Sequence, residues 1–427
     1  MGGIITTLVL LVALGLGPLY GQIGRYISLR SESSIRNHAE IYFERQAYSH
    51  AAKLYQKIIR EHPEDQKVKL RLGDSYRLLR EPHNAAYWYG QVMQKDQSSA
   101  EHIFYYASVL CSIKKYQQAK FWYLEYLKAN PNDQRAIAAL SSLNNPQLLF
   151  DDRFEVKQLL IELPGAVFSP AIFEEGLVVV GEGNTGSLVK TLTTWIEGPY
   201  YDLYYVPLAD GKPGYPKYLD DNLNSVLHEG PATFFEEGNK VIFTRSTSNK
   251  GDGDTRHLQL MIAERKTSGN WSSPRKLFRH ENYSIGHPAV NKGGTTIYFS
   301  SNMPGGYGGT DIYRTDLING VWQEPVNVGP GINTAGNELF PSLDEEGRLY
   351  FASNGLGGLG GLDIFKADLN GHNQPKNLGF PINSQGDDFG IIWAPNNTFG
   401  YFSSNRKGID GIFSFKLANR ALAERRN

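Results

Sequence analysis

The sequence HPAVNKGGTTIYFSSNMPGGYGGTDIYRTDL at His287–Leu317 decides the fold, because it returns almost whole at Phe340–Leu369 as FPSLDEEGRLYFASNGLGGLGGLDIFKADL. Each copy reads as a short strand, a turn, an alternating aromatic strand, a glycine-rich hairpin loop and a third strand, DIY or DIF. A fourth segment closes each unit, EPVNVGPGIN at Glu324–Asn333 and QPKNLGFPIN at Gln374–Asn383. Four short strands repeated at roughly 50 residues are typical of a β-propeller blade.

The same template fits the rest of residues 151–418. Unit one opens at Ser169-Pro170, unit two at Gly230-Pro231 and unit five at Phe389-Gly390. Unit five lacks a fourth strand, whereas Phe154–Ile161 precedes unit one without a blade of its own. The simplest account is that this N-terminal strand completes the last blade and leaves no open edge. The sequence therefore predicts a five-bladed β-propeller.

Residues 31–146 carry a helical pattern with a period of 34 residues, so the whole chain is predicted to be a multidomain α plus all-β protein. Small residues recur where two helices would cross closely, and tyrosines recur beside them, as in a tetratricopeptide array. Three such units are about the minimum that buries a continuous core, and Arg135–Leu143 is expected to form a capping helix. The three columns are Ala39, Gly73 and Ala107; Ala51, Ala85 and Ala119; and Tyr55, Tyr89 and Tyr123.

Arrays of this kind bind peptides or protein segments in the concave groove that the first helix of each unit lines. The alternative is that the same residues form a solvated face and that the array packs against a partner more generally. Cys111, in the same helical frame, is expected to be a small core residue rather than a reactive thiol. The groove-facing candidates are Arg36, Glu40, Phe43, Lys67, Asp74, Arg77, Phe104 and Ser108.

The N-terminus predicts export. Ile4–Leu19 is mostly apolar, shorter than a membrane span of roughly 20 residues, and ends in small residues as a secretory signal does. Residues 1–21 are therefore predicted to be a signal peptide, with Gln22 at the mature terminus. No Lys or Arg precedes the apolar run, so an uncleaved anchor is the alternative. The expected location is the periplasm, alone or in association with the outer membrane.

Composition narrows the class of partner. A net charge of -1 and a pI near 6.8 give no electrostatic case for nucleic acid or an anionic membrane. The lone Cys111 excludes an intrachain disulfide and a cysteine-based zinc site. No His-x-x-x-His and no Gly-x-Ser-x-Gly is present, so neither of these hydrolase motifs supports an enzyme.

The blade motif, with its Tyr-Phe-x-Ser-Asn strand, glycine-rich loop and Asp-Ile-Tyr/Phe strand, resembles the WD-repeat-like propeller family of bacterial envelope proteins. The order of signal, tetratricopeptide array and propeller is similar to the PorE family of periplasmic type IX secretion and gliding proteins. The resemblance implies a carboxypeptidase-regulatory-like domain and a peptidoglycan-holding OmpA-like domain beyond the propeller. This sequence has only a short basic tail there, residues 419–427, so wall anchoring through this chain is not expected.

Two recurring features have a structural explanation. One aspartate starts the third strand of several blades, namely Asp202, Asp311, Asp363 and Asp410. Because the symmetry of the ring spreads these residues apart, they are not expected to form one catalytic or calcium site. A structural role, in which each carboxylate accepts hydrogen bonds from backbone N–H groups, is favoured. The loops Gly305–Gly309 and Gly355–Gly361 lead into strands rather than helices. They are therefore predicted to be hairpin loops that need positive φ, not phosphate loops.

A second set of acids precedes the innermost strands and could crowd the mouth of the central channel. Paired carboxylates there would suit glycoside hydrolysis or a bound cation. The alternative, which the sequence favours, is a solvated connecting loop. These acids are Glu229, Glu338, Asp387 and Asp388.

The sequence favours a non-catalytic exported scaffold that binds protein partners in the cell envelope, within a type IX secretion or gliding-related assembly. No catalytic residue, metal, cofactor, nucleic acid or small-molecule substrate is predicted. The alternatives are a propeller enzyme that acts on envelope glycans through the channel acids, or a lectin. Propellers serve all three functions, so the fold alone does not decide between them.

Overall fold

The computed structural model describes residues 33–93, 99–183, 200–247, 256–278, 282–369 and 374–418. The predicted signal peptide and the basic tail lie outside these residues. The chain divides into two compact units, of which the first ends at Gln97 and the second begins at Ser98. None of the described helices combines the length and the apolar character that a membrane span needs.

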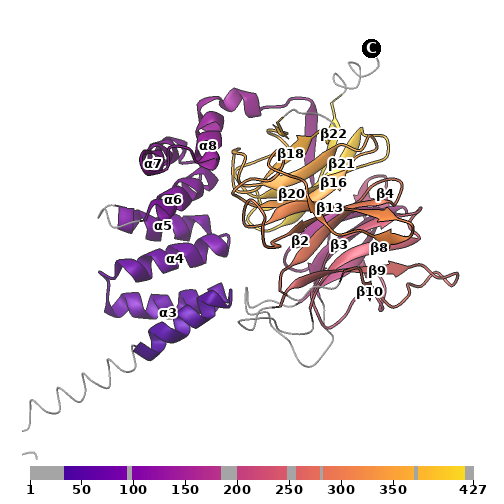
Figure 1. Cartoon of the computed structure of the whole chain (residues 1–427), viewed down its shortest axis with the longest axis horizontal. Coiled ribbons are helices and arrows are strands. Elements are labelled where there is room, and N and C mark those ends of the chain that lie inside the picture. The colour runs from indigo at the N-terminus through magenta and orange to yellow at the C-terminus, as the bar shows by residue number, and fades with distance from the viewer. Residues whose placement is uncertain are drawn as a thin grey trace, which may run out of the picture. The chain divides into compact units, whose positions relative to one another are not determined.

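The first unit is a stack of antiparallel helices (Figure 1). Small residues let the helices approach closely, since Ala51 and Ala85 have no exposed surface. A Cβ on Gly73 would lie 2.4 Å from the Tyr89 ring, so the small-residue column is a packing requirement. The helices are residues 33–44, α3 (Tyr48–Glu61), α4 (Gln66–Leu78) and α5 (Pro82–Met93).

The second unit starts with three more helices, α6 (Ala100–Ser112), α7 (Tyr116–Ala129) and α8 (Gln134–Asn144). Its small and aromatic columns continue, with Ala119 fully buried and Tyr123 4% exposed. The described residues thus form seven helices between residues 33 and 144, which confirms the predicted helical N-terminal region. A short 3-10 helix, η1 (Pro146–Leu149), leads into the sheets.

Five antiparallel sheets follow and form the blades of a β-propeller (Figure 1). Blade 1 contains β2 (Val167–Phe173), β3 (Gly176–Glu182), β4 (Tyr201–Ala209), β5 (Lys212–Pro213) and β6 (Lys217–Tyr218). Blade 2 contains β7 (Glu229–Phe235), β8 (Lys240–Ser246), β9 (Leu258–Glu264) and β10 (Arg275–Lys276). Blade 3 contains β11 (Ile285–Val290), β12 (Thr296–Ser301), β13 (Asp311–Ile318), β14 (Val321–Trp322) and β15 (Val326–Asn327). Blade 4 contains β16 (Glu338–Leu343), β17 (Leu349–Ser353), β18 (Asp363–Ala367) and β19 (Lys376–Asn377).

The last blade is closed by the strand that precedes the first. It contains β20 (Asp388–Trp393), β21 (Phe399–Ser404), β22 (Gly411–Leu417) and β1 (Phe154–Leu159). β1 pairs with β22 over six residues, from Phe154 opposite Leu417 to Leu159 opposite Ile412. The predicted five-bladed propeller and its closure by a borrowed strand are confirmed.

The asparagine that ends the fourth segment of the blade motif hydrogen-bonds the backbone of the third strand. The Asn333 carboxamide accepts from the Ile312 N–H and donates to the Ile312 carbonyl, at 2.8 and 2.9 Å. Asn383 bonds Ile364 in the same way in blade 4. Each carboxamide makes the two hydrogen bonds that a backbone residue of a neighbouring strand would make. Both asparagines are buried.

The glycine-rich loop of blade 4 packs against α8 within the second unit. Gly357 has a φ of 74°, and a Cβ there would lie 2.5 Å from the Ala138 carbonyl oxygen. Gly305 in blade 3 has a φ of 93°. The predicted hairpin loops with positive φ are confirmed at these two residues, and Gly357 also permits the contact with α8.

Candidate functional site

The innermost strand of each blade is kinked at one equivalent position. Register shifts interrupt the pairing of β2, β7, β11, β16 and β20 with the next strand, as a β-bulge does. The bulge residues Ser169, His287 and Phe340 adopt positive φ of 50°, 53° and 52°. Non-glycine residues rarely adopt this conformation, so the inner strands of blades 1, 3 and 4 are strained at their bulges.

A partly open cavity of about 200 Å³ lies directly beside these bulges. No lysine, arginine, aspartate or glutamate lines it among the residues that the structure describes. Its wall combines proline and aliphatic residues with Phe234, Phe340 and Trp393 and with a few polar groups. The polar side chains in the lining are Ser169, Thr233, His287 and Ser342.

His287 is held in one orientation. Its ring stacks on Phe340, with centroids 3.9 Å apart and planes within 9° of each other. Its Nδ1 lies 3.4 Å from the Phe340 N–H and accepts from it, so the neutral ring carries its hydrogen on Nε2. Burial lowers the pKa of His287 to about 3, so the ring is uncharged at neutral pH.

Three residues of the lining carry a buried polar atom that has almost no accessible surface and no hydrogen-bond partner in the described part of the chain. These atoms are the Ser169 Oγ, the Ser342 Oγ and the Trp393 Nε1. Ser169 is only 6% exposed. A buried polar atom without a partner costs roughly 1–3 kcal/mol, so three around one cavity are unusual.

The expectation that the channel acids lie in solvated loops was wrong for Glu229, Glu338 and Asp388, whereas Asp387 lies in a loop and is half-buried. Glu338 has no exposed surface and accepts from the Thr334 N–H at 2.8 Å and from the Ser353 hydroxyl at 2.6 Å. Glu229 and Asp388, equally buried, are held by the guanidinium groups of Arg245 and Arg406 at 2.7 and 2.6 Å. Each carboxylate ties the start of an inner strand to the preceding loop and to the second strand.

The fold brings the two sets of acids together in pairs between blades. Asp202 hydrogen-bonds Glu229, and Asp311 repels Glu338. Burial raises the pKa of Asp202 and of Glu338, and it raises the pKa of Glu229 to about 7. The sequence did not reveal these pairs because their members lie more than 20 residues apart and on different blades.

The third pair, in blades 4 and 5, joins Asp363 to Asp388. Burial raises the pKa of Asp363 well above its usual range, and the charge of Asp388 raises it further. Asp387 points elsewhere and accepts from the Leu362 N–H at 2.8 Å. These carboxyls are structural groups at blade interfaces rather than an open pair facing a substrate.

Two of the four aspartates that start the third strands accept backbone N–H groups with their carboxylates. Asp311 accepts from Tyr307 and Gly308 at 2.6 and 3.1 Å, and Asp363 accepts from Leu359 and Gly360 at 2.9 and 3.2 Å. The predicted structural role is confirmed for these two. Asp202 instead accepts from the Tyr218 hydroxyl at 3.3 Å. Asp410 adds a backbone contact, since its carbonyl accepts from the Val167 N–H at 3.0 Å.

Three groove candidates of the first unit are engaged with neighbouring side chains that are not candidates themselves. Arg36 pairs with Asp65 at 2.6 Å, and Glu40 pairs with Arg71 at 2.9 Å. The Arg71 guanidinium also lies 4.4 Å from the centre of the Phe43 ring. Arg36, Glu40 and Phe43 therefore lie on a partly exposed, charge-paired surface.

The remaining candidates differ in accessibility. Lys67 is exposed, whereas Asp74 is 7% exposed and accepts from the Tyr89 hydroxyl at 2.7 Å. Arg77 donates to that same hydroxyl at 3.3 Å. Asp74 is thus part of the helix packing, because its carboxylate is needed to satisfy a buried tyrosine. Whether this surface binds a partner stays a prediction.

In the second unit, Phe104 is buried and Ser108 is half-buried. Phe104 packs on Tyr123 and Tyr126 with Arg135 over its ring, so it belongs to the helix core. Cys111 is buried too, and burial raises the pKa of its thiol to about 12. No group of three or more potential metal ligands occurs among the described residues.

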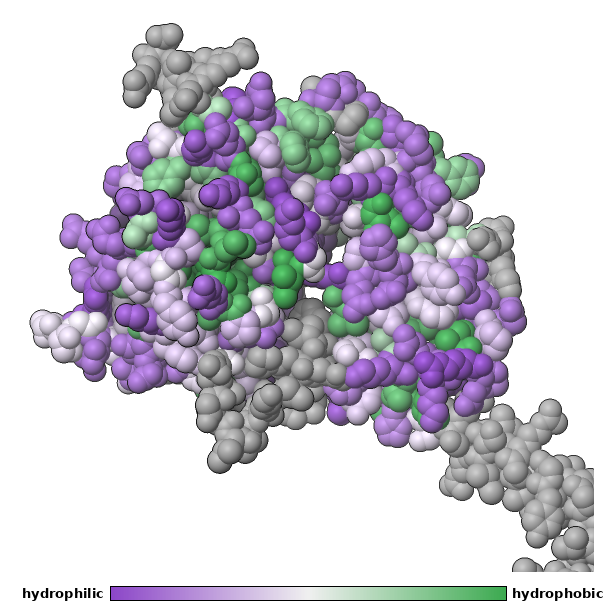
Figure 2. Space-filling view, turned by 180° about the vertical axis from the view of Figure 1, so that it is seen from behind, coloured by the Kyte–Doolittle hydropathy of each residue, from purple (hydrophilic) through white to green (hydrophobic). Residues whose placement is uncertain are grey.

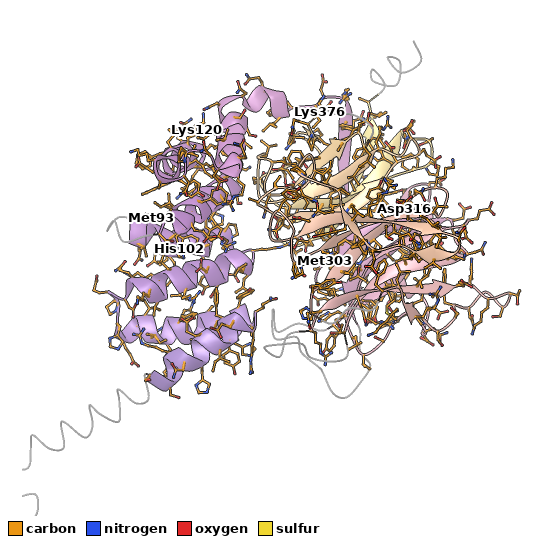
Figure 3. All side chains as sticks on the ribbon, in the orientation of Figure 1. Met93, His102, Lys120, Met303, Asp316 and Lys376 are labelled. Atoms are coloured by element: carbon orange, nitrogen blue, oxygen red, sulfur yellow. The ribbon has the colours of Figure 1, made fainter. Side chains whose placement is uncertain are left out.

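Exposed apolar residues do not gather into one large patch on the face that Figure 2 presents, where hydrophobic groups are small and separated by hydrophilic ones. Side chains fill the spaces between the blades, and charged groups such as Asp316 on β13 and Lys376 on β19 lie away from the inner strands (Figure 3). The cavity lined by the inner strands is therefore the best-defined candidate site of the propeller.

No protein-family model matches the chain, and no curated protein matches it either. Solved structures are similar at low identity. A puromycin-hydrolysing peptidase of Mycobacterium tuberculosis is 14% identical with a TM-score of 0.34, over 58% of this chain and 36% of that one. The chain thus spans about a third of that peptidase.

Two further structures match single parts. The catalytic domain of the Coprinopsis cinerea α-L-arabinofuranosidase is 10% identical with a TM-score of 0.35, over 62% of this chain and 97% of that one. The first tetratricopeptide domain of Spaghetti, bound to an HSP90 peptide, is 17% identical with a TM-score of 0.25, over 28% of this chain and 94% of that one. No family is established by these matches, and none of them is a PorE-like protein.

One prediction from sequence has to be corrected on these comparisons. The chain was expected not to be an enzyme, and that exclusion was wrong. The similar propellers include arabinofuranosidases, a sialidase, an aldose sugar dehydrogenase and peptidases. Those activities belong to those proteins.

Proposed function

We propose that this chain works in the cell envelope and that its helices form a tetratricopeptide array which binds a protein partner. The observation that carries the proposal is the packing of the 34-residue columns. Ala51, Ala85 and Ala119 are all fully buried, and Tyr89 fills the space beside Gly73. Helix pairs that repeat in this way present a ridged surface of first helices, the kind of surface on which such arrays hold extended segments.

The chemistry of this surface in the first unit is mixed in charge. Arg36 and Arg71 are already paired with acids, whereas Lys67 stands exposed on α4. A partner that binds here would meet the exposed ammonium group of Lys67. Beside it lie ion pairs in which an acidic group of the partner can replace the acid now paired with Arg36 or Arg71. An acidic segment of the partner fits this surface best.

A charge reversal at Lys67 tests the proposal, with Lys57 on α3 as the matched control because both are exposed lysines. Partners are recovered from envelope fractions with each tagged variant and are quantified by mass spectrometry. Lys67→Glu is expected to lose one partner that both the wild type and Lys57→Glu retain. Equal recovery with both variants would exclude this part of α4 as the binding surface.

The predicted signal peptide and the domain order support a location in the periplasm and a role in a type IX secretion or gliding-related assembly. N-terminal sequencing of the mature protein tests the location. A mature terminus at or near Gln22 in the periplasmic or outer-membrane fraction is expected, whereas Met1 retained on cytosolic material would contradict it.

A second candidate function is that the propeller acts on an envelope glycan, as a lectin or an enzyme. The channel cavity, whose lining carries no formally charged side chain among the described residues, favours it. Glu229, Glu338 and Asp388 are buried and bonded, so an enzymatic version needs other residues than these acids. Co-sedimentation with insoluble peptidoglycan, together with assay of released sugars, tests this candidate; neither retention nor release would reject it.

A further inference from the structure

We propose that the outer edge of β1 pairs with the same strand of a second copy of this chain, so that one continuous sheet joins two propellers in a two-fold symmetric dimer. The dimer goes beyond the proposed function, because it involves neither the helical array nor the channel. Three features of β1 support it, namely the length of its open edge, the direction of its backbone groups and the order of its charges.

The open edge of β1 is long. β1 spans six residues, whereas the outermost strands of the other blades have two residues each, namely β5, β6, β10, β14, β15 and β19. Closure of the ring uses only the inner edge of β1, because β22 is its one sheet neighbour among the described strands. Folded proteins usually keep exposed strand edges short or protected, since a long free edge pairs with other chains. The outer edge of β1 is therefore a surface that a further strand can extend.

The backbone of β1 presents a regular row of donors and acceptors along this edge. The Ala418 N–H donates to the Arg153 carbonyl at 2.7 Å, which makes these two residues a hydrogen-bonded pair of the ladder. Such pairs alternate in an antiparallel ladder, so every second residue from Arg153 bonds to β22 and the residues between them direct their N–H and C=O groups outward. In the described part of the chain, no hydrogen bond engages these outward groups. The outward-facing residues are Phe154, Val156 and Gln158.

A second copy of β1 can satisfy every one of these groups. When two copies run antiparallel about a two-fold axis at Val156, this residue faces Val156 of the second copy, and Phe154 faces Gln158 of the second copy. Each of these is a hydrogen-bonded pair, because outward groups of both strands meet there. A pairing shifted by one residue would set outward groups against residues whose own groups already bond to β22.

The charges of β1 select this register over its neighbours. Glu155 and Lys157 are both exposed and lie on either side of Val156. With the axis at Val156, each Glu155 faces Lys157 of the other copy, which gives two pairs of opposite charge. An axis at Glu155 or at Lys157 also aligns the outward groups, but it sets two glutamates or two lysines opposite each other, which is unfavourable. The edge is therefore complementary to itself in one register.

Sedimentation velocity of the purified full chain over a range of concentrations tests the proposal. One strand from each copy makes a smaller interface than the roughly 1,600 Å² of a typical stable complex, so a reversible, concentration-dependent dimer is expected. A chain that stays monomeric would overturn the proposal. A monomer that instead binds an extended segment of another protein at β1 would equally reject the second copy as the occupant of this edge.

Cysteine crosslinking locates the axis. Val156→Cys should form a disulfide between two copies, because Cα atoms of a hydrogen-bonded pair lie about 5.5 Å apart, within the range of a disulfide. Gln158→Cys is the matched control, since the two copies of this residue lie four residues apart along the sheet, about 14 Å, and should not link. The one native cysteine, Cys111, is buried. Equal crosslinking by both variants, or none by Val156→Cys, would contradict the register.

Two charge variants test the pairing of side chains. In Lys157→Glu, and likewise in Glu155→Lys, like charges face each other across the axis, so dimerisation is expected to weaken about tenfold. An equimolar mixture of the two variants should recover it, because their charges are complementary. Glu155→Lys also loses a surface pair with Lys416, so the melting temperature of each variant is measured to establish that it is folded. A dimer that neither variant weakens, or a mixture that stays monomeric, would reject β1 as the interface.

Discussion

At the scale of single residues, the inner-strand acids determine how the blades hold together. Asp388 has no exposed surface and its carboxylate binds the Arg406 guanidinium. Breaking a buried pair leaves an uncompensated charge, which costs about 3–5 kcal/mol. Asp388→Asn should therefore destabilise the propeller by this order. Asp316→Asn, which removes an acid from a surface pair with Arg314, should cost less than about 1 kcal/mol. Denaturant unfolding of both variants measures the difference; equal midpoints would contradict the structural role of the acid.

The raised pKa of Glu229 makes the stability of the fold depend on pH. Its folded pKa of about 7 lies above the ordinary glutamate value of 4.5, so the native state holds the proton more tightly than the unfolded state does. The resulting contribution to stability is complete below pH 4.5 and is lost as the pH rises through 7. Glu229→Gln lacks this titration. Between pH 5 and 8 the melting temperature of the wild type should fall relative to that of Glu229→Gln, and parallel curves would refute the assignment.

The sequence predicted part of this site. The spacing placed the acids at the starts of the inner and third strands, and the bonds of Asp311 and Asp363 followed from turn chemistry. The sequence could not show that a neighbouring blade covers Glu338, because burial between blades depends on contacts between residues distant in the chain. The channel cavity was missed for the same reason, although the proline that follows each bulge in blades 1 to 4 was visible as a recurring signal.

At the scale of elements, β1 closes the ring. Deleting Asp151–Leu163 removes the outer strand of blade 5 and exposes the edge of β22. The loss should amount to several kcal/mol, a large part of the stability of a domain. Thermal unfolding compares this deletion with the intact chain. A β1 deletion that melts like the intact chain would mean that closure contributes little.

The loop of blade 4 that contacts α8 predicts a second effect at this scale. Gly357→Ala introduces a Cβ at positive φ and against the Ala138 carbonyl, whereas Gly347→Ala introduces one at a φ of 76° with no atom within 4 Å. The control should cost about 1 kcal/mol from φ alone. Gly357→Ala should cost roughly 1–3 kcal/mol more from the clash. Chemical denaturation distinguishes the two; equal losses would argue against close packing of α8 on this loop.

The helices and strands were the part of the structure that the sequence predicted best. The 34-residue columns and the blade repeat each recur several times, and repetition makes the residues that packing requires stand out from those that vary. The borrowed strand followed from counting strands against the need to leave no edge. The groove was less predictable, because Asp74 and Phe104 share the helical spacing of exposed positions and yet satisfy or fill the core.

At the scale of the whole molecule, a partner-binding helical array and a propeller with a neutral channel would give one chain two binding functions. The central claim is that the helical array binds a protein in the envelope. Photo-crosslinking in intact cells tests it most directly, with the photoreactive residue placed at Lys67 and, as a control, at Lys57. The account predicts one discrete crosslinked product to an envelope protein from position 67 and none from position 57. No product from position 67, or the same products from both positions, would contradict it.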